Sequence, residues 1–171
     1  MRSPNRPQQG QGRPGPAGYR GAHRGGFQGG GGRNEPQGPS AALSDLLPRI
    51  KLATPEADLF DKTAEKAAQE IANGNKDANR PTQIRKFFDE LCMWETKVRQ
   101  NPGRFGDYLP FIRMMNAKVA YAFGRKPQLV DDNFRAFFQR CIEQIVDDKT
   151  LWHAKLFFEA FLGFYKVEKK D

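Results

Sequence analysis

From residue 54 onward, apolar side chains recur every three to four residues, the spacing of one face of an α-helix. Five such stretches follow one another, at about residues 54–72, 82–100, 107–124, 131–146 and 150–167. A shorter apolar segment, residues 40–52, precedes them. Because Pro48 interrupts it, we interpret it as a short helix or docking turn. No stretch of the sequence alternates apolar and polar residues as a half-buried strand does. The pattern predicts an all-α fold, a compact helical bundle of about five helices.

Residues that favour helix ends divide these stretches. Asn73 and Gly74 are expected to end the first long helix. Pro110 is expected in the first turn of the third, where its missing N–H costs no hydrogen bond. Asp147 and Asp148 are interpreted as solvated acids at a helix end. The predicted N-terminal caps are Thr54, Thr82, Asp107 and Asp131.

Two of the helical stretches carry specific expectations about burial. The stretch at 150–167 is apolar on more than one side, so it is either central in the bundle or covered by a partner. The stretch at 107–124 is expected to bury a single apolar stripe against the core. Its predicted members are Phe111, Met114, Met115, Val119, Ala122 and Phe123.

Composition separates the first 40 residues from the rest. Residues 1–40 hold 12 of the 17 Gly, 6 of the 12 Pro, six Arg and one acid, with few large apolar side chains. Such a segment cannot offset the entropy of backbone ordering, so we expect a disordered Arg/Gly-rich tail followed by a helical domain at 41–171. The tail either contacts RNA through arginine and its two aromatic residues, Tyr19 and Phe27, or is a solubilising extension.

Several classes of function have no support in the sequence. No run of 18 apolar residues predicts a membrane helix, and no apolar core of a secretory signal is present at the N-terminus, so we expect a cytoplasmic protein. Cys92 and Cys141 fall within helices and are interpreted as core thiols. His23 and His153 have no metal-ligand spacing around them, and no phosphate-binding loop occurs. We therefore expect no metal, no cofactor and no catalysis by this chain alone.

Basic residues gather around two helix segments, residues 80–86 and 116–126. The first lies at a helix start, where unpaired N–H groups and the helix dipole already favour anions. In the second, Lys118 and Arg125 lie on one helix face with Tyr121 between them, an arrangement that suits phosphates and bases. The alternative is an ordinary solvated face, which the small excess of 22 basic over 19 acidic residues after residue 40 slightly favours.

Residues 81–90 (PTQIRKFFDE) followed by residues 117–125 (AKVAYAFGR) resemble the two hallmark helices of one family. It is the small subunit of the type III-A CRISPR interference (Csm) complex. The closing helix, residues 153–166, is similar to the same family, so the resemblance covers about residues 54–168. The Arg/Gly tail departs from the family pattern, and no role for it follows from the resemblance.

The resemblance implies a non-catalytic RNA clamp that stacks in several copies along the duplex of guide RNA and target RNA. Its partners would be these two RNAs, the backbone and large subunits of the complex, and further copies of itself. RNA cleavage would belong to another subunit, and the duplex would be held by its backbone while base pairing reads sequence. The implied RNA contacts are Gln83, Arg85, Lys86, Lys118, Tyr121 and Arg125, with Arg80 and Lys126 as flanking additions.

The sequence leaves two alternatives to the clamp open. One is a helical protein–protein adaptor, in which the aromatic last helix and a Met-bearing helix dock a partner. The other is a free RNA chaperone that acts through the Arg/Gly tail.

Overall fold

The computed structural model describes residues 38–169, which contain six α-helices and no strand. The predicted all-α fold is therefore confirmed, with a short helix added before the five long ones. Residues 1–37 of the predicted tail lie outside the described residues, and the division of the chain at residue 40 stays a prediction. The helices are α1 (Ala41–Leu46), α2 (Ala64–Ala72), α3 (Pro81–Gln100), α4 (Phe105–Gly124), α5 (Asp132–Glu143) and α6 (Asp148–Glu168). Two single turns, η1 (Leu47–Arg49) and η2 (Leu59–Thr63), lie between α1 and α2.

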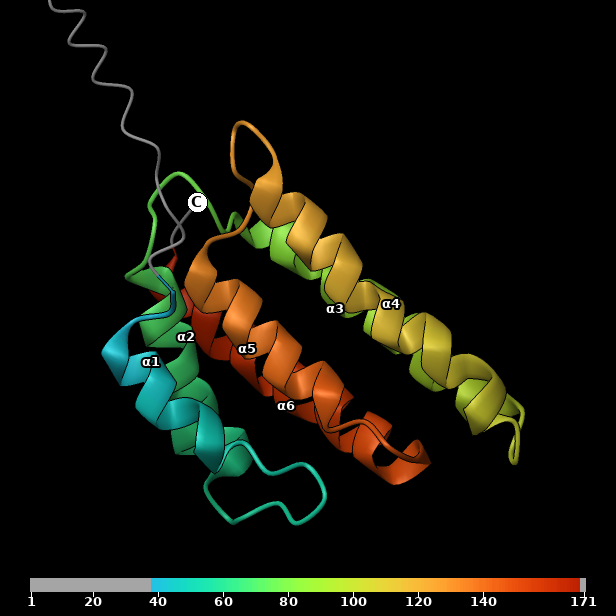
Figure 1. Cartoon of the computed structure of the whole chain (residues 1–171). Helices are drawn as coiled ribbons and strands as arrows, with labels where there is room; N and C mark the ends of the chain where they lie inside the picture. The colour runs from blue at the N-terminus through green and yellow to red at the C-terminus, as the bar shows by residue number, and fades with distance from the viewer. Residues whose placement is uncertain (1–37, 170–171) are drawn as a thin grey trace, which may run out of the picture. The chain divides into compact units, whose positions relative to one another are not determined.

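Helix α6 occupies the centre of the bundle. It packs against α2 and α3, while α3 pairs with α4 and α4 packs on α5 (Figure 1). Buried residues occur along most of α6, from Thr150 to Tyr165. Of the two explanations for its apolar surface, a central position in the bundle is the one that the structure shows.

Phenylalanine rings of α3, α5 and α6 form the middle of the core. The ring centroids of Phe137 and Phe161 are 4.6 Å apart, and those of Phe87 and Phe138 are 5.5 Å apart. Each such pair adds about 0.5–1.5 kcal/mol beyond the burial of apolar area. These rings fix α3 against α5 and α6, and α3 in turn supports α4.

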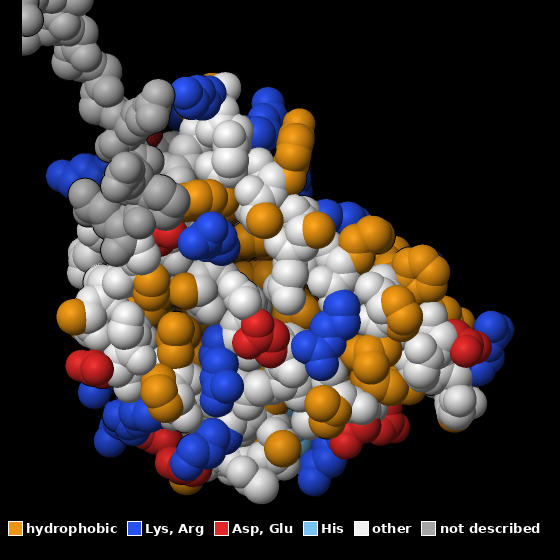
Figure 2. All heavy atoms as spheres, in the orientation of Figure 1, with side chains coloured by type: hydrophobic (Ala, Val, Ile, Leu, Met, Phe, Trp, Pro, Cys, Tyr) orange, Lys and Arg blue, Asp and Glu red, His pale blue; other side chains and the backbone are white. Residues whose placement is uncertain are grey.

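Helix α4 presents two apolar stripes, and the predicted core stripe mixed them. The stripe that packs inward consists of Ile112, Met115, Val119 and Ala122. Phe111 and Met114, which were expected in the core, are 49% and 47% exposed, so this part of the prediction is wrong. Figure 2 shows the resulting apolar side chains on the surface over α4. Because both stripes have helical spacing, periodicity alone does not decide which one faces inward.

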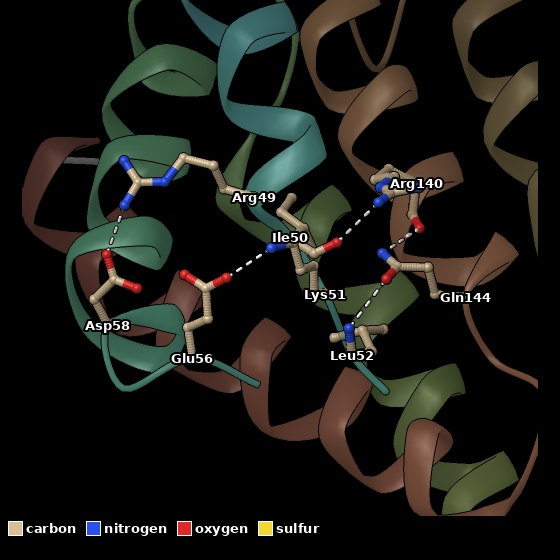
Figure 3. A network of polar contacts seen from close by, with 8 residues as sticks. All are labelled: Arg49, Ile50, Lys51, Leu52, Glu56, Asp58, Arg140 and Gln144. Carbon is tan, nitrogen blue, oxygen red and sulfur yellow. Dashed lines mark hydrogen bonds and ion pairs between the residues drawn. The ribbon is translucent and has the colours of Figure 1, made fainter. Parts of the chain in front are cut away.

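The segment between η1 and η2 is irregular, with bends and a turn, and side chains from α5, its C-terminal cap and α6 hold its backbone. Arg140 donates to the carbonyl of Ile50 at 3.1 Å, and Leu52 N–H donates to Gln144 Oε1 at 3.0 Å (Figure 3). His153 Nδ1 lies 2.6 Å from the carbonyl oxygen of Leu52. Thr54 therefore does not cap a helix, and helical structure resumes only at η2. That predicted cap is wrong, since the tertiary hydrogen bonds outweigh the local signal.

The other predicted caps have mixed outcomes. Asp131 caps α5 by accepting from Phe134 N–H, as predicted. Thr82 is not a cap, because Pro81 takes the first helical position and Arg80 precedes it. Asp107 is not a cap either: α4 begins two residues earlier, which moves Pro110 beyond the first turn.

At the start of α6, Asp147 accepts from Thr150 N–H and forms a capping box. This acid is a cap, and the interpretation of Asp147 as merely solvated is wrong.

Candidate nucleic-acid interface

The two basic segments, far apart in the sequence, lie at the same end of the pair α3 and α4. These helices run antiparallel, so the start of α3 lies beside the end of α4 (Figure 1). An ion pair between Lys118 Nζ and Glu90 Oε1, 2.6 Å apart, marks the register of the two helices. Lys86 is one turn from Glu90 toward this end, and Arg125 is two turns beyond Lys118. Segments 80–86 and 118–126 therefore form one surface.

Two loops complete this end of the helix pair. Residues 73–80 connect α2 to α3, and residues 125–131 connect α4 to α5. Asn79 N–H donates to the carbonyl of Leu129 at 2.9 Å, and Asn75 Nδ2 donates to Gln128 Oε1 at 3.4 Å. These two hydrogen bonds hold the 73–80 loop against the 125–131 loop.

The exposed cations of this surface form a group that we call the basic end. Their side chains make no hydrogen bond or ion pair with any described residue. Beside them, α3 starts at Pro81 without a side-chain cap, so its dipole adds a positive partial charge. Sequence reasoning missed Lys76, which stands next to Asp77 and belongs to neither motif. The basic end consists of Lys76, Arg80, Lys86, Arg125 and Lys126.

The acids near the basic end are mostly occupied elsewhere. Asp131 is buried, and its carboxylate accepts from the N–H groups of Phe134 and Asn75. Asp132 pairs with Arg135 at 3.2 Å. Asp77 is the exposed acid on the 73–80 loop. The positive charge of the basic end is therefore left largely unneutralised.

Two predicted contacts, Arg85 and Lys118, already have partners within the chain. Arg85 Nε lies 2.9 Å from Asp89 Oδ1, and its guanidinium stands over the ring of Phe88. It points about 100° around α3 from Lys86, so it does not share the surface that faces α4. Lys118 lies on that surface but pairs with Glu90. Exposed ion pairs of this kind contribute about 0–1 kcal/mol, so a phosphate can replace either carboxylate.

Tyr121 and Gln83 take different positions on the same surface. The Tyr121 side chain is 72% exposed, on the same face of α4 as Lys118 and Arg125. Its ring is thus open for stacking or hydrogen bonding. Gln83 is half-buried in the first turn of α3, and its backbone N–H donates to the carbonyl of Arg80.

Comparison with family models gives a match over residues 54–171 to the family described as Csm2 Type III-A. The chain belongs to this family. The match includes both basic segments and every helix from α2 to α6, and it leaves out α1. Neither the curated proteins nor the solved structures contain a match to the chain. Family membership makes the protein a small subunit of the Csm complex in type III-A CRISPR defence.

The two cysteines and His153 are buried or half-buried within the helical bundle. Burial raises the pKa of the Cys141 thiol and that of Cys92, which is half-buried rather than fully in the core. His153 is a packing residue that contacts the Leu52 carbonyl. Within residues 38–169, no group of three or more His, Cys, Asp or Glu side chains is arranged to hold a metal ion. No helix in that range has the length and hydropathy of a membrane span.

Proposed function

We propose that this Csm2 subunit binds RNA through the basic end and contacts the phosphate backbone of the guide–target duplex. Several copies would line the duplex, alongside the backbone and large subunits. The observation that supports this is the group of exposed, unpartnered cations gathered by two loops and the start of α3. A cation without an internal partner binds a phosphate without first breaking an ion pair.

The proposed contacts fall into two groups. Arg80, Lys86, Arg125 and Lys126 would bind phosphates directly, and Tyr121 would stack or hydrogen-bond beside them. Arg85 and Lys118 would exchange a carboxylate for a phosphate, and Gln83 would contribute at the rim. Contacts of this kind are independent of sequence, so recognition is left to base pairing. The chain would act in the cytoplasm as a clamp, without a catalytic step of its own.

The salt dependence of target RNA binding tests this proposal. The reconstituted complex would carry the triple variant Lys86→Ala, Arg125→Ala and Lys126→Ala, and its Kd would be measured over a range of salt concentrations. Loss of three phosphate contacts lowers the slope of log K against log salt by about 2–3 units per copy engaged.

A matched control removes three exposed cations elsewhere. Lys62, Lys66 and Lys149 lie on η2, α2 and α6, and their side chains also make no hydrogen bond or ion pair with another described residue. Their alanine variant has the same charge as the test variant. Equal slopes for the two triple variants would contradict the proposal.

A second candidate function, docking of another protein, is supported by the exposed stripe of α4. Phe111 and Met114 are half exposed, and the ring of Phe111 stacks on that of Trp94 at 5.7 Å between centroids. The variant Phe111→Ser with Met114→Ser would then lower the amount of subunit that co-purifies with the complex while its salt slope stays unchanged. A free RNA chaperone instead requires the tail, so deletion of residues 1–37, which leaves the Ser40 cap intact, would abolish RNA binding.

A further inference from the structure

The two loops of the basic end meet at one buried residue, Asn79. It is fully buried although both loops are polar, and its backbone has φ of 56°, in the left-handed region. Asparagine tolerates that region better than most residues other than glycine. A buried polar side chain in this conformation needs specific hydrogen-bond partners.

Asn79 makes four hydrogen bonds, to three other segments of the chain. Its N–H donates to Leu129 O at 2.9 Å, and its Oδ1 accepts from Asp131 N–H at 3.0 Å, so it binds the 125–131 loop twice. Its Nδ2 donates to Ile71 O in α2 at 3.4 Å. Its carbonyl accepts from Tyr165 Oη, near the end of α6, at 2.6 Å.

Neighbouring contacts reinforce the same junction. Burial raises the pKa of Tyr165, which keeps its hydroxyl protonated and able to donate. Asp131 Oδ2 accepts from Asn75 N–H, and a Cβ added at Gly74 would collide with that carboxylate. Lys169 Nζ donates to the carbonyl of Ala78. The loop before α3 is therefore tied to α2, α6 and the α4–α5 loop at once.

We infer that Asn79 is a positioning residue for RNA binding, because it fixes Arg80 relative to Arg125 and Lys126. This inference rests on the function proposed above. Arg80 follows Asn79 directly, and Asn79 bonds to the loop on which Arg125 and Lys126 lie. Without the Asn79 side-chain amide, each loop keeps its charges. The distance between Arg80 and the pair Arg125 and Lys126 is then no longer fixed at a value that suits neighbouring phosphates.

The test variant is Asn79→Gly, which keeps the left-handed backbone accessible and removes only the side chain. Gln144→Ala is the matched control, since Gln144 is also a neutral amide that holds a loop backbone. It lies beyond the opposite end of α5, about 20 Å from Asp131. Both variants would be assembled into the complex and studied well below their unfolding temperatures.

For Asn79→Gly we expect the slope of log K against log salt to fall by about one unit, the equivalent of one lost phosphate contact. Gln144→Ala should keep the wild-type slope. Equal slopes in wild type, Asn79→Gly and Gln144→Ala would overturn the inference. Should Asn79→Gly fail to fold, Tyr165→Phe removes only the hydroxyl that binds the Asn79 carbonyl. That variant should lower the slope in the same direction, and a wild-type slope for Tyr165→Phe would equally overturn the inference.

The triple variant of the basic end separates this inference from the proposed function. If the triple variant lowers the slope and Asn79→Gly does not, positioning by Asn79 is wrong while the RNA surface stands. If the triple variant has a wild-type slope, the RNA surface itself is wrong, and the role of Asn79 falls with it.

Discussion

The two ends of the pair α3 and α4 both carry cations but differ in what those cations contact. The last turn of α3 and the start of α4 form the paired end, which carries Lys97, Arg99 and Arg104. Here Arg99 lies 3.6 Å from Glu95 and Arg104 lies 2.8 Å from Asp107. Lys97 stands over the Trp94 ring at 4.8 Å. At the basic end, Arg80, Lys86, Arg125 and Lys126 have no such partner among the described residues.

The difference shows that the availability of a charge matters more than its presence. The hydrogen bond from Arg104 to Asp107 raises the pKa of the arginine and also occupies its Nε–H. A phosphate at that end competes with a carboxylate that is already in place. At the basic end a phosphate displaces only water from these cations. Dissolved salt screens the charges at both ends to the same extent. The account therefore predicts a large asymmetry between variants of the two ends.

The largest effect is expected from charge reversal at the basic end. Lys86→Glu with Arg125→Glu should weaken target RNA binding by the complex more than tenfold, because two attractive contacts become repulsive. Arg99→Glu with Arg104→Glu, which has the same change in charge, should leave Kd within about twofold. Titration of labelled target RNA gives both values. Similar losses at the two ends would remove the asymmetry.

A smaller effect, on stability, is expected at the α6 cap beside the paired end. Asp147→Ala should lower the free energy of unfolding by about 1 kcal/mol through loss of the cap. Hydrogen bonds from Thr150 lower the pKa of Asp147 in the folded chain. The stabilisation by this carboxylate is therefore complete at pH values above the pKa of an unfolded aspartate, and it is lost as the pH falls through the lower folded pKa. Chemical denaturation at pH 7 and in acid measures both effects.

Asp148→Asn is the control for this cap, because it removes a carboxylate from the same turn and leaves the capping box intact. The gap in stability between wild type and Asp147→Ala should narrow in acid. An equal loss in Asp148→Asn would mean that charge, and not capping, is the cause.

The smallest effect is a gain of affinity. Glu90→Gln keeps an acceptor for the Trp94 indole and releases Lys118 from its ion pair, so RNA binding by the complex should strengthen about two- to threefold with a steeper salt slope. Asp107→Asn releases Arg104 at the paired end and should change neither quantity. A gain in Asp107→Asn equal to that in Glu90→Gln would show that net charge alone governs binding.

The sequence was sufficient for those features that depend on local pattern. Helical periodicity predicted the long helices. The prediction that Asp131 caps α5 is confirmed because the signal for a cap is local and no tertiary contact overrides it. Residues 81–90 and 117–125 were sufficient to indicate the family. Two of the wrong caps, Thr82 and Asp107, lie only two and three residues after the positions that precede the helices, Arg80 and Arg104.

Features that depend on pairing between segments could not be predicted in this way. The partnership of Lys118 with Glu90 depends on the register of two antiparallel helices, and the burial of Asn79 depends on four segments meeting. Thr54 is kept out of a helix because the backbone just before it is bonded to the side chains of Arg140 and Gln144. These two residues lie about ninety positions further along the chain. In α4, Lys118 shares a helix face with Phe111 and Met114. This lysine was the available signal that the face points outward, as the exposure of both residues shows.

The most direct test of the central claim is cross-linking of RNA to this subunit within the assembled complex, with the linked residues identified by mass spectrometry. The account predicts links on the basic end and at Tyr121, in segments 76–86 and 118–126. Links confined to the paired end, around Lys97 and Arg104, or to the outer face of α2, would contradict it.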